Sequence, residues 1–169
     1  MGSQKIALKG NKEVFAQGDK VVYPLYGAGV IQELRRQTID GNDHVSYVLK
    51  MPVGNMEITV SAKKAESIGV RSVTKKSELL KLIKNVKTVP MPENWNQRYK
   101  ENMDVIKTGN ISKVAEVFRT LRERERERGL SSAEKKMLTT LKQIILSEII
   151  LSHDLERPAA EALLEKAIY

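Results

Sequence analysis

The stretch Met56–Val86, MEITVSAKKAESIGVRSVTKKSELLKLIKNV, decides the fold because its apolar periodicity changes near Thr74. Before the change, Met56, Ile58 and Val60 alternate with polar residues, which is typical of a half-buried strand. After it, the apolar residues follow the spacing of an amphipathic helix, and they are Leu79, Leu80, Leu82, Ile83 and Val86. We therefore expect a domain boundary at Thr74.

The chain before this boundary, residues 14–74, has the pattern of short strands separated by turns. Lys20–Tyr23, Val30–Leu34 and His44–Leu49 are rich in β-branched residues or alternate between polar and apolar positions. Ile39–Asn42, with Asp-Gly at its centre, predicts a turn between two of them. Several short strands at this spacing predict a small antiparallel barrel or curled sheet.

The chain after the boundary, residues 75–169, predicts a compact helical bundle, so the whole fold is expected to be α+β. Thr74 or Ser77 is the expected N-cap of the first helix, and Val89–Pro92 follows as an extended break because it contains two prolines. Further helices are expected at about 96–107, at 112–128, from the capping box Ser131-Ser132-Ala133-Glu134 to about 152, and after Arg157-Pro158.

Composition excludes several kinds of site. The 169 residues include no Cys and two His, which excludes a disulfide framework, thiol catalysis and a Cys/His zinc site. Phosphate-loop and EF-hand patterns are missing from the sequence. A cytoplasmic location is expected because no run approaches the ~18 apolar residues of a membrane span. Residues 1–13, mostly small or charged, are expected to be a tag or a disordered N-terminus.

The positive charge is concentrated in one segment. The net charge is +8, and Lys75–Lys100 carries 7 basic against 2 acidic residues. This segment contains the single tryptophan, Trp95, which follows a Pro-x-Pro stretch and has polar neighbours. An apolar wedge beside basic residues is how minor-groove proteins unstack DNA. A core residue that anchors the bundle explains the same tryptophan, and the residues alone leave both interpretations open.

The alternating tract Arg122–Arg128 is also charged, but its signs alternate residue by residue. Opposite charges meet at i,i+3 on a helix and cancel the field that a phosphate would experience. We interpret this tract as a solvated helix end rather than a nucleic-acid contact.

Motifs in both halves of the chain occur in a consistent order. They are Gly18-Asp19-Lys20-Val21-Val22-Tyr23-Pro24, Gly27-x-Gly29-Val30, Tyr47-x-Leu49 and Gly69-Val70-Arg71, then Asn94-Trp95-x-x-Arg98-Tyr99-Lys100, Lys113-Val114-Ala115-Glu116-Val117 and Glu127-Arg128-Gly129-Leu130-Ser131-x-x-Glu134-Lys135. Over about residues 15–169, this set resembles the CarD/CdnL family of bacterial transcription regulators.

The resemblance implies a protein without enzyme activity, metal or cofactor. It implies a Tudor-like domain of residues 14–74 that binds the β subunit of RNA polymerase, a domain also found in transcription-repair coupling factors. The helical domain of residues 75–169 would bind promoter DNA at the upstream edge of the transcription bubble and hold the promoter open. The resemblance further implies a monomer that acts on the nucleoid and binds no membrane.

The resemblance also implies site residues in both domains. Trp95 would be the minor-groove wedge, and the DNA-backbone contacts would be Gln97, Arg98, Lys100 and Lys135. The polymerase contacts would be Gln37, Met56, Ile58, Thr59 and Val60.

The strand that carries most of these polymerase contacts would add edge-to-edge to a strand of the partner, unless it belongs to a closed barrel. The sequence departs from the family at Gln97, where Arg is common, and at Gln37 and Thr59, where some relatives carry Arg. Two other functions stay open: a nucleic-acid-binding protein that acts without polymerase, and a peptide-binding adaptor that uses the sheet alone.

Overall fold

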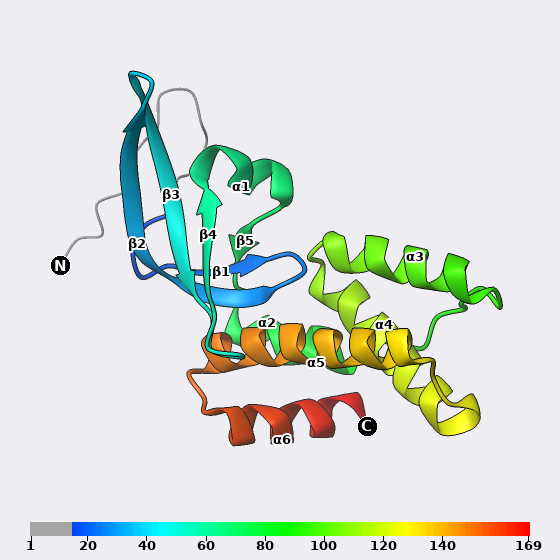
Figure 1. Ribbon diagram of the computed structural model, residues 1–169. Helices are drawn as coiled ribbons and strands as arrows, with labels where there is room; N and C mark the ends of the chain where they lie inside the picture. The colour runs from blue at the N-terminus through cyan, green and yellow to red at the C-terminus, as the bar shows by residue number, and fades with distance from the viewer. Residues whose placement is uncertain (1–14) are drawn as a thin grey trace.

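The computed structural model describes residues 15–169, so the expectation for residues 1–13 lies outside the described part. Five strands form one antiparallel sheet, and they are β1 (Lys20–Tyr23), β2 (Gly27–Ile39), β3 (Asn42–Lys50), β4 (Glu57–Ser61) and β5 (Arg71–Ser72). Their order in the sheet is β4-β3-β2-β1-β5, which leaves β4 and β5 at its two edges (Figure 1). The predicted antiparallel β domain is confirmed.

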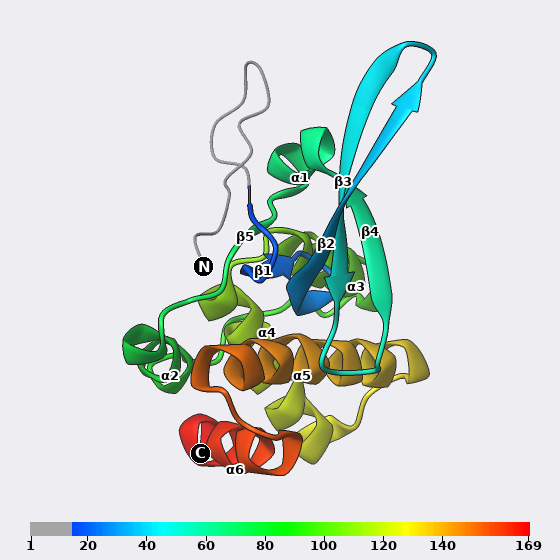
Figure 2. The same cartoon turned by 90° about the vertical axis from the view of Figure 1, so that its left-hand side faces the viewer.

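The hairpin of β2 and β3 projects beyond the rest of the sheet (Figures 1 and 2). Its turn is the predicted one: Asp40 and Gly41 have φ values of 50° and 77°, and Ile39 pairs with Asn42. Two consecutive positive φ angles are typical of the tight turns that match strand twist. Closer to the base of the hairpin, Ile31, Tyr47 and Leu49 turn inward and form the core of the β domain.

One element of the β domain differs from the pattern of strands and turns expected for residues 14–74. Helix α1 spans Ala62–Ile68 and ends at Gly69, whose φ of 92° lets the chain turn back into β5. The helix buries only Ala65, so its sequence shows no helical period of apolar residues.

The helical domain contains the predicted bundle. Its helices are α2 (Lys76–Lys84), α3 (Trp95–Lys107), α4 (Ile111–Arg128), α5 (Ser132–His153) and α6 (Arg157–Ile168). The N-cap of α2 is Lys75, without a side-chain hydrogen bond, so the expected Thr74 or Ser77 cap is wrong. The capping box of Ser131 and Glu134 at the start of α5 is confirmed.

Helix α5 is central to the molecule, because it packs against α4, α6 and α2 and also against strand β2 (Figures 1 and 2). Its inward face carries Leu141, Ile145 and Ile149, which are fully buried in the bundle core. Each helix of residues 15–169 is too short or too polar to cross a lipid bilayer.

Candidate nucleic-acid interface

Trp95 is the first residue of α3, and 54% of its surface is exposed. The side chain of Asn94 caps the helix by accepting a hydrogen bond from the backbone N–H of Gln97 at 3.0 Å. Because α3 begins at Trp95, the indole stands at a helix end and outside the bundle core. Of the two interpretations that the sequence left open, the core interpretation is therefore wrong.

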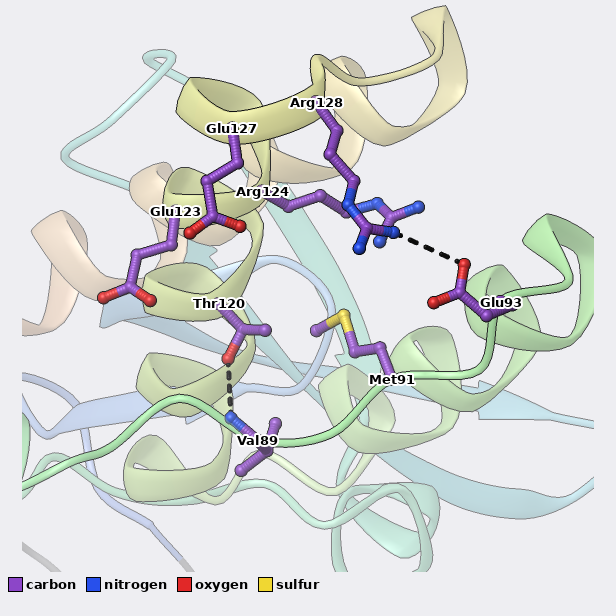
Figure 3. A pocket seen from close by; sticks show the side chains of 8 residues that line it. All are labelled: Val89, Met91, Glu93, Thr120, Glu123, Arg124, Glu127 and Arg128. Atoms are coloured by element: carbon purple, nitrogen blue, oxygen red, sulfur yellow. Dashed lines mark hydrogen bonds and ion pairs between the residues drawn. The ribbon is translucent and has the colours of Figure 1, made fainter.

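The segment Val89–Asn94, which we call the strap, is the last part of the connection between α2 and Trp95. The backbone N–H of Val89 donates a hydrogen bond to Thr120 Oγ1 on α4 at 3.0 Å (Figure 3). Further along, Met91 Sδ accepts from Asn102 Nδ2 at 3.7 Å. The strap is thus fixed by side chains of α3 and α4.

Arg98 is the main support of the strap. Its Nη1 donates to the carbonyl oxygens of Pro92 at 2.8 Å and Glu93 at 3.0 Å, while its Nε pairs with Glu134 on α5. Arg98 is 3% exposed, so the expectation that it reaches a DNA phosphate is corrected. Its first-turn position turns it inward toward α5, where it positions the residues that lead into Trp95.

Glu134 completes this support from the other side. Its side chain accepts hydrogen bonds from the backbone N–H and hydroxyl of Ser131, at 3.1 Å and 3.0 Å, in addition to the pair with Arg98. Burial alone would raise the pKa of the Glu134 carboxyl, but the bonds from Arg98 and Ser131 outweigh it, and the pKa is lowered. Glu134 therefore stays ionised and keeps α3 joined to α5.

The other predicted DNA-binding residues are exposed. Gln97 and Lys100 lie on α3 with Trp95, and Gln97 donates to Glu101 Oε1 at 3.0 Å. Lys135 follows Glu134 directly and is exposed at the start of α5. The three side chains share exposure, but Lys135 lines a hollow between α4 and α5, whereas the other two lie on α3.

The charge excess of residues 75–100 does not form one surface beside Trp95. Helix α2, which carries Lys76, Lys81 and Lys84, packs against α4, α5 and α6, whereas α3 packs against α4. Figures 1 and 2 show α2 and α3 apart in both views. Proximity in sequence was misleading here because the strap separates the two helices.

A cavity of about 180 Å³ lies between the strap and the outer face of α4 (Figure 3). Glu93 of the strap forms an ion pair with Arg128 at 3.5 Å, and Glu123, Arg124 and Glu127 complete its charged lining. Three carboxylates face two guanidinium groups, so the cavity offers a phosphate no net positive charge. Within residues 15–169, no group of three or more acidic or His side chains could hold a metal ion.

The predicted polymerase-binding strand, β4, is an edge strand. In the described chain it pairs with β3 alone, so the alternative of a closed barrel strand is wrong. Ile58 is half-buried and Val60 is 5% exposed, so both face the β core, while Met56 and Thr59 are exposed. A partner strand would therefore contact mainly the β4 backbone and these two side chains.

Gln37 lies elsewhere on the sheet. It is exposed on β2 and pairs with His44, whereas β4 begins its pairing with β3 only at Ser46. Gln37 thus belongs to the outer part of the hairpin, beyond the end of β4.

Sequence reasoning missed the residues that support Trp95. Asn102 has no motif, and Glu134 is visible in the sequence only as the fourth residue of a capping box. A buried partner for Arg98 could not be identified because Glu134 is 36 residues away along the chain.

Two family models match the chain: "CarD-like/TRCF RID domain" over residues 15–74 and "CarD, C-terminal domain" over residues 78–165. A curated relative from Bacillus subtilis (strain 168), named "Putative transcription factor YdeB", is 35% identical over 141 residues. That match covers 80% of this chain and 90% of the relative. The chain therefore belongs to the CarD family of transcription factors.

Proposed function

We propose that this transcription factor docks on the β subunit of RNA polymerase through β4 and wedges Trp95 into the minor groove at the upstream edge of the promoter bubble. The wedge stabilises the open promoter complex. The observation that carries the proposal is the exposure of Trp95, 54%, at the end of a helix whose approach segment is fixed by a buried ion pair. We expect the protein to act as a monomer on the nucleoid.

The energetics of insertion favour a fixed tryptophan at a bubble edge. Inserting an apolar side chain between bases costs a few kcal/mol of lost stacking in an intact duplex. At the edge of a bubble the last base pair already lacks a neighbour on one side, so the cost is lower. Because Arg98 and Asn102 hold the strap, little conformational entropy is lost when the indole inserts.

Backbone phosphates would be contacted from the elements that hold Trp95. Lys100 on α3 and Lys135 on α5 are exposed and have no carboxylate partner within 4 Å in residues 15–169. Gln97 would contribute a neutral hydrogen bond. With so few phosphate contacts, we expect weak, largely sequence-independent DNA binding, with a Kd of ~10⁻⁴–10⁻⁶ M at physiological salt.

The wedge is tested by the lifetime of the open complex formed by full-length protein, polymerase holoenzyme and promoter DNA. Trp95→Ala should remain folded and keep polymerase binding, but it should lose the lengthening of the lifetime. Tyr26→Ala is the matched control, because Tyr26 is an aromatic residue of the β domain with a similar exposure, 48%. An unchanged lifetime with Trp95→Ala, or a loss of ~3 kcal/mol or more in its stability, contradicts the wedge.

The polymerase contact is tested by capture of the full-length protein on immobilised β subunit. Thr59→Glu should weaken capture, because a charged side chain on an edge strand opposes the addition of another strand, and this charge is opposite to that of the Arg that some relatives carry here. Gln32→Glu, at an exposed position of the inner strand β2, should leave capture unchanged. If the wild-type protein is not retained, the result favours the alternative of a nucleic-acid-binding protein that acts without polymerase.

A further inference from the structure

The buried polar side chains of residues 15–169 fall into two clusters that share helix α5. They are Arg98, Asn102, Glu134, Ser147 and Glu148, with exposures of 0–5%. The first three hold the strap before Trp95, as described above. The last two contact the β domain and form the centre of a second cluster, which we call the latch.

Glu148 is the fully buried carboxylate of the latch. Arg71 of β5 binds it with two parallel hydrogen bonds, Nη1 to Oε1 at 2.8 Å and Nη2 to Oε2 at 3.0 Å. The backbone N–H of Thr74 donates to Oε1 at 2.9 Å. The buried Glu148 carboxylate keeps these three hydrogen bonds only while β5 and the following residues stay packed against α5.

Arg71 also reaches the helix that carries Trp95. Its Nε donates to the carbonyl oxygen of Gly109 at 2.9 Å, directly after the C-terminal end of α3. The first turn of α3 is joined to α5 through Arg98 and Glu134. The C-terminal end of α3 is thus tied to the β domain, and its first turn is tied to α5.

Contacts on the same side of α5 extend the latch. Ser147 Oγ accepts from the backbone N–H of Ala28 on β2 at 2.8 Å. Lys20 of β1 donates to the carbonyl oxygen of Leu151 at 2.8 Å, and Ser152 Oγ donates to the carbonyl oxygen of Thr74 at 3.0 Å. Strands β1, β2 and β5 therefore all contact the C-terminal half of one continuous helix.

Helix α5 spans the distance between the two clusters. Glu134 and Glu148 are 14 residues apart, which corresponds to about 21 Å along a helix. A buried ion pair contributes little net stability compared with a well-packed apolar pair, but it fixes geometry. A helix with one such pair near each end therefore acts as a strut between the β domain and Trp95.

We propose that Glu148 is a positioning residue. Through Arg71 it fixes the angle between the two domains and so determines where Trp95 stands relative to the β4 edge. The effect on the open complex rests on the proposed function, whereas the fixed angle is a property of the free protein.

The angle is tested in the full-length protein by spin labels at Lys64→Cys on α1 and Asp104→Cys on α3, two exposed positions in a chain without native Cys. Electron–electron double resonance should give one narrow distance distribution for the otherwise wild-type protein. Glu148→Gln should broaden the distance distribution at least twofold. The amide has a single acceptor oxygen, so it cannot accept hydrogen bonds from both Nη atoms of Arg71 as the carboxylate does. Arg71→Ala, at a side chain 30% exposed, provides the same test if Glu148→Gln fails to fold.

Glu161→Gln is the matched control, because it breaks an exposed i,i+4 pair with Arg157 on α6 and should leave the distribution narrow. A narrow distribution in folded Glu148→Gln or Arg71→Ala would overturn the proposal.

The functional consequence is tested with the same variants on promoter complexes. Binding of each variant to fork DNA alone and to the β subunit alone should stay within twofold of wild type, while the lengthening of the open-complex lifetime falls at least fivefold. A wild-type lifetime in a variant with a broadened distribution would overturn the positioning role. If the wild-type protein itself does not lengthen the lifetime, the proposed function fails, and the distance distributions still decide whether Glu148 fixes the angle.

Discussion

Trp95 and Arg98 lie three residues apart on α3 and have opposite surroundings, because one faces solvent and the other faces α5. The exposed residue is available to a partner, and the buried residue holds the backbone that leads to it. The same division applies to the neighbouring cations: Lys100 is exposed, and its ammonium is free to meet a phosphate. At the scale of single residues, burial rather than charge separates contact residues from supporting ones.

Exposed lysines on α3 and α5 should contribute to the salt dependence of DNA binding. Lys100→Ala and Lys135→Ala should each weaken binding evenly across sequences and flatten the plot of log K against log salt by about one. Lys81→Ala, on α2, should leave the slope unchanged, because α2 lies apart from α3. The measurement is fluorescence anisotropy with fork DNA over a salt series. Equal slopes for Lys100→Ala and Lys81→Ala would remove Lys100 from the phosphate contacts.

Gln97 offers a gain-of-function change at the same surface. It is exposed in the first turn of α3, where the resemblance to the family led us to expect Arg. Gln97→Arg should tighten DNA binding and steepen the salt slope by about one, because a new cation meets a phosphate. Unchanged stability in urea denaturation serves as the control for folding. A variant with tighter binding and an unchanged slope would show that the gain is not a phosphate contact.

At the scale of elements, the predictable parts of the fold are those with a repeated local pattern. Strands β1 to β4 and helices α2 to α6 carry such patterns, and the capping box located the start of α5 correctly. Helix α1 was missed because Ala65 is its single buried residue. The supports of Trp95 were also missed, because the pairing of Arg98 with Glu134 depends on the packing of two helices and leaves no local pattern.

The start of α5 depends on one carboxylate, so it should be sensitive to acid. The folded-state pKa of Glu134 lies below the usual value of about 4.5. Its contribution to stability is therefore complete above about pH 4.5 and is lost as the pH falls through the folded pKa. Glu134→Gln should lower the free energy of unfolding by about 1–3 kcal/mol at pH 7, because Arg98 loses its charged partner. The difference from wild type should narrow below pH 4.5.

Urea denaturation at pH 7, 5, 4 and 3 measures this dependence. Glu165→Gln is the matched control, because Glu165 pairs with Arg122 at the surface with 43% of its side chain exposed. The control should change the free energy of unfolding by less than about 1 kcal/mol. A difference between Glu134→Gln and wild type that stays constant down to pH 3 would mean that the Glu134 carboxylate does not contribute through its charge.

At the scale of the whole molecule, the two domains meet at a surface where backbone comes close to backbone. Gly27, at the start of β2, has a φ of 98°, and a Cβ there would lie 2.5 Å from Ser147 Oγ and 3.2 Å from Ile144 Cα of α5. A Cβ at Gly109 would lie 3.0 Å from Cγ of the Pro24 side chain, so the helical domain also comes close to the β domain here. Glycine at these positions is required by the contact between domains as well as by the local turn.

Gly27→Ala should therefore destabilise the protein through two separable effects. The left-handed backbone conformation costs an alanine about 1 kcal/mol. The clash with α5 adds about 1–3 kcal/mol, because Ile144 Cα is backbone and cannot move aside like a flexible side chain. Gly18→Ala isolates the first effect, since Gly18 has a φ of 89° and a Cβ there would meet nothing within 4 Å. Urea denaturation of the two variants should show the larger loss for Gly27→Ala, and equal losses would mean that the domains separate readily enough to admit a methyl group between them.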